Sequence, residues 1–202
     1  MLKITSSKAV LVLWLMALAG PAAAEGPLGG LAERATDSSV DTDVFAQEAN
    51  AEVLRLLQHD PTEADVAAIP RLIDAFHRSG TDRQDDVLKL LAQLLPGSTK
   101  YHSAILDTAV EALQSPSPGV RVAAVDVLAR SKNAAVVSQM VDSLSDPYWG
   151  VRYQALYGLS FFVDQGGHEE ILEAVAPLVE DKNERVRVMA RTLMREALGA
   201  GD

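Results

Sequence analysis

The sequence predicts an all-α protein, a right-handed α-solenoid of about four stacked helical hairpins, and three observations support this prediction. First, the 202-residue chain is 48% hydrophobic but only 5% aromatic, and a core rich in Ala, Val and Leu suits closely packed helices. Second, no stretch alternates with the period of two that a half-buried strand requires. Third, one residue pattern recurs along the second half of the chain, which is typical of repeat architectures.

The first segment has the three parts of a secretory signal peptide. Its start carries Lys3 and Lys8, residues 9–19 form an uninterrupted apolar run, and residues 22–24 are alanines. The apolar run is shorter than the roughly 20 residues that span a bilayer, so an uncleaved anchor is the lesser alternative. Cleavage is expected after Ala24, which predicts a periplasmic or secreted protein with no membrane insertion after signal cleavage.

Charge and cysteine content exclude several classes of partner and site. The formal net charge of −10 argues against nucleic acid and anionic membranes, because phosphate binding needs a basic face. The chain contains no cysteine, which excludes disulfides, thiolate metal sites and a lipidated cysteine anchor. The acidic surface itself is interpreted as a solubility feature.

A flexible segment is expected before the helices. Residues 25–42 are rich in Gly, Ser, Thr and acidic residues, and they are expected to form a flexible acidic leader. Its acidic residues, with Asp43, lack the spacing of a calcium loop. The repeat domain is expected at residues 43–202.

The domain is expected to begin with a helix that ends near Pro61. Its predicted buried face carries Phe45, Ala49, Val53, Leu56 and Leu57. The next helix is expected to start with a capping box formed by Thr62 and Asp65 and to run to about His77. A kink or restart is expected at Pro70, because proline lacks a backbone N–H.

The recurring pattern consists of gapless segments at residues 115–128, 145–159 and 180–194. Each has an anchor valine, then an arginine, an alanine four residues after the anchor, and Leu or Met eight residues after it. The segments contain Val120, Arg121, Ala124 and Leu128; Val151, Arg152, Ala155 and Leu159; and Val186, Arg187, Ala190 and Met194. A weaker unit is anchored on Val87. These offsets place one apolar stripe on each helix.

Two helices, a turn with Asp-Pro, then Val-Arg and a small residue resemble the HEAT-repeat family, particularly the short HEAT-like repeats of phycobilin lyases. The resemblance covers about residues 62–198. It implies a ladder between successive units, in which a turn aspartate pairs with the arginine six residues later: Asp146 with Arg152, and Asp181 with Arg187. Ser115 replaces the aspartate before Arg121, and Leu88 stands where the first unit would carry arginine. We interpret these charges as structural.

No catalytic or metal-binding motif is found in the sequence. The four histidines, His59, His77, His102 and His168, are far apart along the chain, and none has a second histidine at the spacing of a zinc site. Phosphate-binding loops and nucleophile elbows are also missing. We therefore predict no catalytic residue, no metal and no cofactor.

The aromatic residues are concentrated in one segment, Tyr148–Phe162. Spacing of four residues aligns Trp149, Tyr153, Tyr157 and Phe161 along one side of a helix. The position of Tyr157 is Asp126 or Thr192 in the other units, and that of Phe161 is Arg130 or Glu196. We predict that Trp149, Tyr157 and Phe161, with Tyr148, form a partner-binding patch on the concave face. The alternative is that the leader or the first helix covers this patch.

These observations favour an exported protein–protein interaction scaffold or adaptor that binds an extended or helical segment on its concave face. The resemblance to phycobilin lyases implies an alternative, the binding or attachment of a small hydrophobic cofactor. A purely structural module in a larger complex is a third possibility. Neither a partner's identity nor an oligomeric state follows from the sequence.

Overall fold

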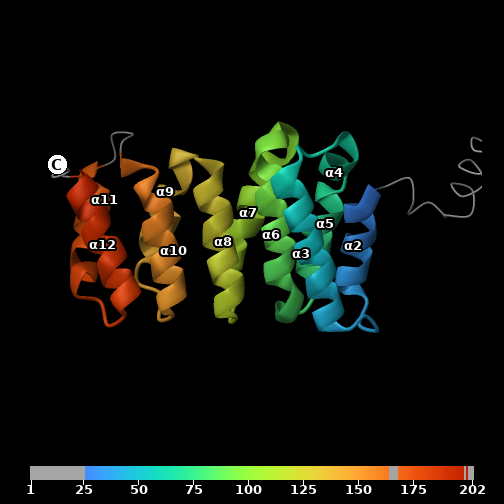
Figure 1. Cartoon of the computed structure of the whole chain (residues 1–202), viewed down its shortest axis with the longest axis horizontal. Coiled ribbons are helices and arrows are strands. Elements are labelled where there is room, and N and C mark those ends of the chain that lie inside the picture. Colours follow the sequence, from blue (N-terminus) through green and yellow to red (C-terminus); the bar gives the residue numbers. More distant parts are fainter. Residues whose placement is uncertain (1–25, 164–167, 198, 200–202) are drawn as a thin grey trace, which may run out of the picture.

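The computed structural model describes residues 26–163, 168–197 and 199, and within these ranges every regular element is a helix (Figure 1). The predicted signal peptide, residues 1–24, lies outside the described residues. None of the described helices is both long and apolar enough to cross a membrane.

The helices follow one another as consecutive antiparallel pairs. In chain order they are α2 (Gly26–Thr36), α3 (Thr42–Gln58), α4 (Glu63–Ala67), α5 (Ile69–Arg78), α6 (Thr81–Leu94), α7 (His102–Ala112), α8 (Pro118–Ser131), α9 (Val137–Ser143), α10 (Trp149–Ser160), α11 (His168–Val175) and α12 (Glu184–Ala197). The hairpins are α2–α3, α5–α6, α7–α8, α9–α10 and α11–α12, and the two helices of each are in contact.

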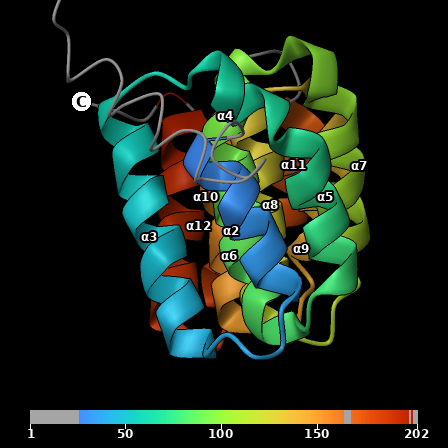
Figure 2. The same ribbon diagram turned by 90° about the vertical axis from the view of Figure 1, so that its right-hand side faces the viewer.

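The hairpins stack into an α-solenoid with two layers. Each second helix packs on the next one along the chain, in the order α3, α6, α8, α10, α12. Figure 2 views the stack from its α2 end. In this view, one side of the stack is formed by α3, α10 and α12, and the other by α5, α7 and α9. We call the layer of α3, α6, α8, α10 and α12 the second-helix layer. The predicted fold class is confirmed.

The expected flexible leader at residues 25–42 is wrong for most of its length, because residues 26–36 form α2. Leu28, Leu31, Ala32 and Ala35 of this helix are buried, and their spacing of three and four residues makes an apolar stripe. The stripe packs against α5 and α3. The glycines of this segment favoured a flexible chain in the sequence analysis, so the apolar stripe was overlooked. Since α2 pairs with α3, the described solenoid has a hairpin where a lone leading helix was expected.

The predicted start of the second hairpin is confirmed in detail. The Thr62 hydroxyl accepts a hydrogen bond from the Asp65 amide, and the Asp65 carboxylate accepts one from the Thr62 amide. The helix stops at Ala67 and restarts as α5, with Pro70 in its first turn, where its missing N–H costs nothing.

The predicted buried face of α3 is wrong at one residue. Leu57 is 59% exposed and does not belong to that face.

The apolar stripe of the repeat forms the core between the layers. The anchors Val87, Val120, Val151 and Val186 are all fully buried, and so are the alanines four residues after the last three anchors. A small residue at that position lets neighbouring helices approach closely. The stack thereby buries surface that a single hairpin would expose.

Candidate functional site

The predicted aromatic patch lies on α10 and on the two residues that flank it, Tyr148 and Phe161. Tyr148 (39% exposed), Tyr157 (44%) and Phe161 (45%) are among the most exposed large apolar side chains of the described residues. Trp149 is half-buried and packs against the core, as does Tyr153. The helix α2, which could have covered these side chains, packs instead on α3 and α5.

The structure divides the aromatic row into two clusters. Tyr148 and Trp149 lie 5.8 Å apart between ring centroids, and the Arg185 guanidinium from α12 lies 5.6 Å from the centroid of Trp149. About two helical turns further on, Tyr157 and Phe161 make an edge-to-face pair with centroids 5.0 Å apart. Each cluster opens into a different cavity.

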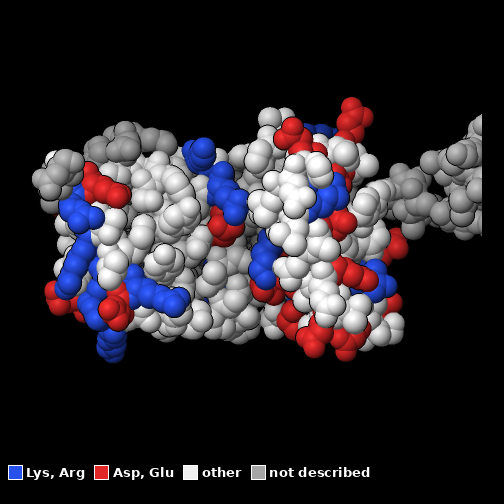
Figure 3. All heavy atoms as spheres, viewed as in Figure 1, with Lys and Arg blue, Asp and Glu red and all other residues white. Residues whose placement is uncertain are grey.

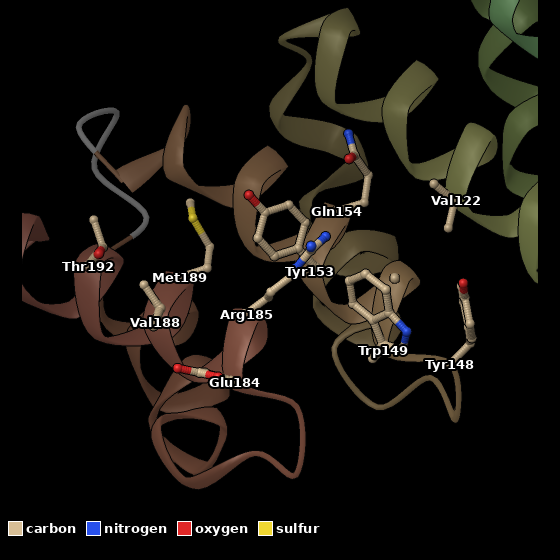
Figure 4. Close-up of a pocket in the computed structure, with 11 residues that line it drawn as sticks. Val122, Tyr148, Trp149, Tyr153, Gln154, Glu184, Arg185, Val188, Met189 and Thr192 are labelled. Atoms are coloured by element: carbon tan, nitrogen blue, oxygen red, sulfur yellow. The ribbon is translucent and has the colours of Figure 1, made fainter.

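The first cavity lies between α10 and α12 and has a volume of about 690 Å³. Figure 4 shows Trp149 and Tyr153 of α10 facing Val188 and Met189 of α12, with Val122 of α8 at the far side. The other lining residues are Tyr148, Gly150, Gln154, Glu184, Arg185 and Thr192. The lining is mostly apolar, with Glu184 and Arg185 as its charged groups.

Two further cavities continue from the first toward α6. A cavity of about 520 Å³ shares Val122, Tyr148 and Gln154 with the first. A third cavity of about 320 Å³ contains Tyr157 and Phe161 and shares Asp126 with the second. We call these three adjoining cavities the second-helix groove.

Several polar side chains of the groove are paired with one another. Asp126 accepts hydrogen bonds from Gln154 (3.0 Å) and Arg130 (2.7 Å). Lys89 donates to Asp85 (3.0 Å) and Asp86 (2.8 Å). Burial raises the pKa of Asp86, and the lysine only partly offsets this. Within the described residues, no buried polar side-chain atom lacks a hydrogen-bond partner.

Charge is unevenly distributed over this face. Figure 3 shows an area without charged atoms over the upper part of α10, with Lys and Arg side chains over α12, over the lower end of α10 and over the upper end of α8. The charged side chains that line the groove are nearly balanced: Lys89, Arg130, Lys132 and Arg185 against Asp85, Asp126 and Glu184. In a chain with a net charge of −10, the groove thus has a small positive excess, and α12 beside it carries four arginines against two glutamates.

The predicted ladder exists, but its side-chain pairs are shifted by one unit. Arg121 binds the Asp146 carboxylate of the next turn with two hydrogen bonds of 2.7 and 2.9 Å, and Arg152 binds Asp181 in the same way at 2.8 and 2.7 Å. To the aspartate of its own turn, Arg152 donates only at the backbone carbonyl, at 2.8 Å. The expected carboxylate pairing of Asp146 with Arg152 is therefore corrected.

The shift explains why two residues depart from the repeat. An arginine at the position of Leu88 would face residue 115 of the following turn, which is Ser115. Both halves of one rung are therefore replaced together. At the other end, Arg187 donates to the Asp181 carbonyl at 2.7 Å, and no carboxylate of the described residues forms an ion pair with it.

The aspartates of the ladder have lowered pKa values because of their hydrogen bonds, and the ladder lies outside the groove. Burial alone would raise the pKa of Asp146, but hydrogen bonds from Arg121 and the Tyr148 amide outweigh it and hold the pKa below its usual value. Arg152 and the Asn183 amide do the same for the pKa of Asp181. None of the ladder residues lines the second-helix groove.

The sequence analysis missed two arginines with distinct roles. Arg83 is buried and binds the backbone carbonyls that end α2. Arg185, which covers Trp149, stands where α10 has Gly150 and α8 has Gly119. Comparison of the repeat units could have identified Arg185, because those two units have glycine at its position. Arg83 lies four residues before the anchor Val87, and no difference between repeat units pointed to it.

The described histidine side chains do not form a cluster. His77 lies 3.2 Å from Glu111 and also contacts the Ile73 carbonyl at 2.7 Å. No cluster of three or more His, Cys, Asp or Glu side chains that could hold a metal ion occurs in the part of the chain that the structure describes. The side chain of His168 lies outside that part.

Comparisons with known proteins agree with this architecture. Residues 69–160, from α5 to the end of α10, match the family described as HEAT repeats. The crystal structure of YibA from Escherichia coli is similar, with a TM-score of 0.65 at 18% identity, over 86% of this chain and 62% of YibA. An engineered protein is similar, with a TM-score of 0.56 at 20% identity over 90% of this chain and 86% of its own. No curated protein matches the sequence.

Proposed function

We propose that this protein is an exported interaction scaffold that holds a segment of a partner protein in the second-helix groove. HEAT-repeat solenoids generally mediate protein interactions and are typically not enzymes. One observation carries the proposal for this chain: the groove is lined by exposed aromatic side chains at positions where the sister helices carry polar ones. Specificity in such folds resides in surface residues of this kind.

The energetic argument rests on Tyr157 and Phe161. Both side chains are nearly half exposed at the edge of the third cavity, so a bound segment would remove their apolar surface from water. Burial of apolar surface stabilises a complex by about 25 cal/mol per Å². Aromatic side chains are frequent interface anchors, because they contribute a large area at a low entropic cost.

The proposal is tested by the double variant Tyr157→Ala with Phe161→Ala. Crosslinking of the mature protein in its native envelope, followed by a pull-down, should lose the partner while the melting temperature changes by only a few degrees. Val44→Ala with Leu54→Ala is a matched control, because both side chains are exposed and lie on α3, outside the groove. Equal capture by the two variants would refute the proposal, and unfolding of the first would mean that the aromatic pair is structural.

Export is a separate part of the proposal and rests on residues 1–24 of the sequence. Cell fractionation and mass spectrometry of the amino terminus test it directly. The expected product begins at Glu25 and is found outside the cytoplasm. A cytoplasmic protein that retains Met1–Ala24 would contradict export and leave the groove argument intact.

The first cavity favours a second candidate function, the binding of a small hydrophobic cofactor. Its volume of about 690 Å³ falls within the range of roughly 300–1,000 Å³ usual for small-molecule sites, and Trp149, Tyr153 and Met189 give it an apolar wall. An absorbance titration with a linear tetrapyrrole would detect such binding. Because Tyr157 and Phe161 do not line this cavity, their alanine variant should bind a cofactor normally, which separates the two functions.

A further inference from the structure

We infer that the segment held in the second-helix groove is an acidic amphipathic helix. This inference rests on the proposed function and names the chemistry of its partner. Three properties of the groove support it: several of its polar side chains are already paired with one another, its charged side chains without an ion pair among the described residues are cationic except Glu184, and its two aromatic clusters have a spacing that a helix can match.

The pairing of polar groups favours a helix over an extended segment. An extended peptide needs side chains that accept and donate to its backbone N–H and C=O groups. In the groove, Asp126 already binds Gln154 and Arg130, and Lys89 already binds Asp85. A helix satisfies its backbone internally and asks the groove only for apolar surface and charge.

The lining side chains that lack an ion pair favour acidic flanks on the partner, because two of them, Arg185 and Lys132, are cationic and one, Glu184, is anionic. Arg185 lines the first cavity and Lys132 lines the third. Among the described residues, no carboxylate lies within ion-pair distance of either side chain; Arg185 instead covers the Trp149 ring at 5.6 Å. A carboxylate on the partner would complete each site, and the basic margin of α12 would repel a cationic segment.

The spacing of the aromatic clusters sets the register of the partner. Trp149 and Tyr153 belong to the first cavity, and Tyr157 and Phe161 to the third. The midpoints of these pairs are separated along α10 by about 12 Å, at a rise of about 1.5 Å per residue. On a partner helix that lies parallel to α10, two large apolar side chains about two helical turns apart match this separation.

A displayed library of random 20-residue peptides, selected on the full mature chain, tests the inference. The expected survivors are acidic, contain two large apolar residues seven or eight positions apart, and become helical by circular dichroism on binding. Replacing the acids of the best peptide by amides should weaken its binding roughly tenfold at low salt. Tyr157→Ala with Phe161→Ala should remove its binding.

Charge reversal provides the second arm of the test. Arg185→Glu with Lys132→Glu should select basic helices from the same library, whereas the charge-matched control Arg78→Glu with Lys100→Glu, outside the groove, should select the same acidic peptides as the parent chain. Selection of basic, proline-rich or non-helical peptides by the parent chain, or of no peptide, would overturn the inference. The proposed scaffold role would still be decided separately, by the crosslinked native partner.

Discussion

The N-terminal and C-terminal hairpins of this solenoid are joined by different polar contacts. Between the later hairpins, Arg121 and Arg152 each bind an aspartate of the following turn. Between the first two hairpins, Arg83 donates to the backbone carbonyls of Arg34 (3.1 Å), Ala35 (3.3 Å), Asp37 (2.8 Å) and Val40. Here the acceptors are the carbonyls at the end of α2 and in the turn that follows.

The difference teaches that the apolar stripe defines the repeat, while its polar contacts are exchangeable. Phe45 and Ala49 of α3 occupy the same offsets as Val120 and Ala124 of α8, and all four are buried. What both ends share beyond the stripe is an arginine that bridges two hairpins, since its rigid five-donor group can satisfy either carboxylates or carbonyls.

The largest effect is expected where Arg83 joins the first two hairpins. Arg83→Ala removes buried or partly buried hydrogen bonds to four carbonyls. The carbonyls of Ala35 and Val40 have no other donor among the described residues, so we expect a loss of about 3–4 kcal/mol in the free energy of unfolding. Hydrogen exchange should show early loss of protection in residues 26–58 and retained protection in residues 118–197. Arg78→Ala, at an exposed ion pair, is the control. Uniform loss along the chain would show that Arg83 does not act locally.

The missing rung can be rebuilt to test whether the two kinds of contact are exchangeable. Leu88 is fully buried, so Leu88→Arg alone should be strongly destabilising, and Ser115→Asp alone nearly neutral. The double variant should recover about 2 kcal/mol relative to the sum of the single ones. Urea denaturation of the four proteins measures this coupling. Additive effects would show that the α6–α8 interface does not bring the two positions together.

Close packing also differs between the two regions. A Cβ atom on Gly158 of α10 would lie 2.8 Å from the Ala129 Cβ and 3.1 Å from the Met140 Sδ, whereas a Cβ on Gly30 of α2 would meet no atom within 4 Å. Gly158→Ala should therefore cost about 1–2 kcal/mol, and Gly30→Ala should stabilise by up to about 1 kcal/mol. Thermal unfolding compares them, and a Gly158→Ala variant as stable as the parent chain would contradict the close approach of α8 and α10.

The smallest effect concerns acid stability. The pKa of Asp181 is lowered in the folded protein, so its stabilisation is complete above its ordinary pKa near 4 and is lost as the pH falls through the folded value. Asp181→Asn should cost about 1 kcal/mol at neutral pH and flatten the fall in stability below about pH 4. An unchanged slope would contradict this.

The opposite sign is expected in the N-terminal region, at Asp86. Its pKa is raised by burial, so its contribution to stability is greatest at low pH and is lost as the pH rises from the ordinary value through the folded one. Asp86→Asn should therefore steepen acid unfolding, measured by urea denaturation over the same pH range. Parallel behaviour of the two variants would show that their carboxylates have similar surroundings.

Much of the candidate site could be predicted from the sequence, because Tyr157 and Phe161 stand where α8 and α12 have polar residues. The exposure of these two side chains could not be predicted, because it depended on whether α2 would cover them. The cavity between α10 and α12 could not be foreseen either, as Val188 and Met189 are ordinary helix residues until α12 packs beside Trp149.

By itself, the sequence determined the helical hairpins, their repeat and the apolar side of each helix, because these follow from spacings within a few turns of one chain segment. Only the tertiary structure decided that Arg121 meets Asp146, that Arg185 covers Trp149, and that three cavities join into a groove. Those contacts link residues on different hairpins, and their distances depend on how far each hairpin rotates and shifts on its neighbour, which no local spacing records.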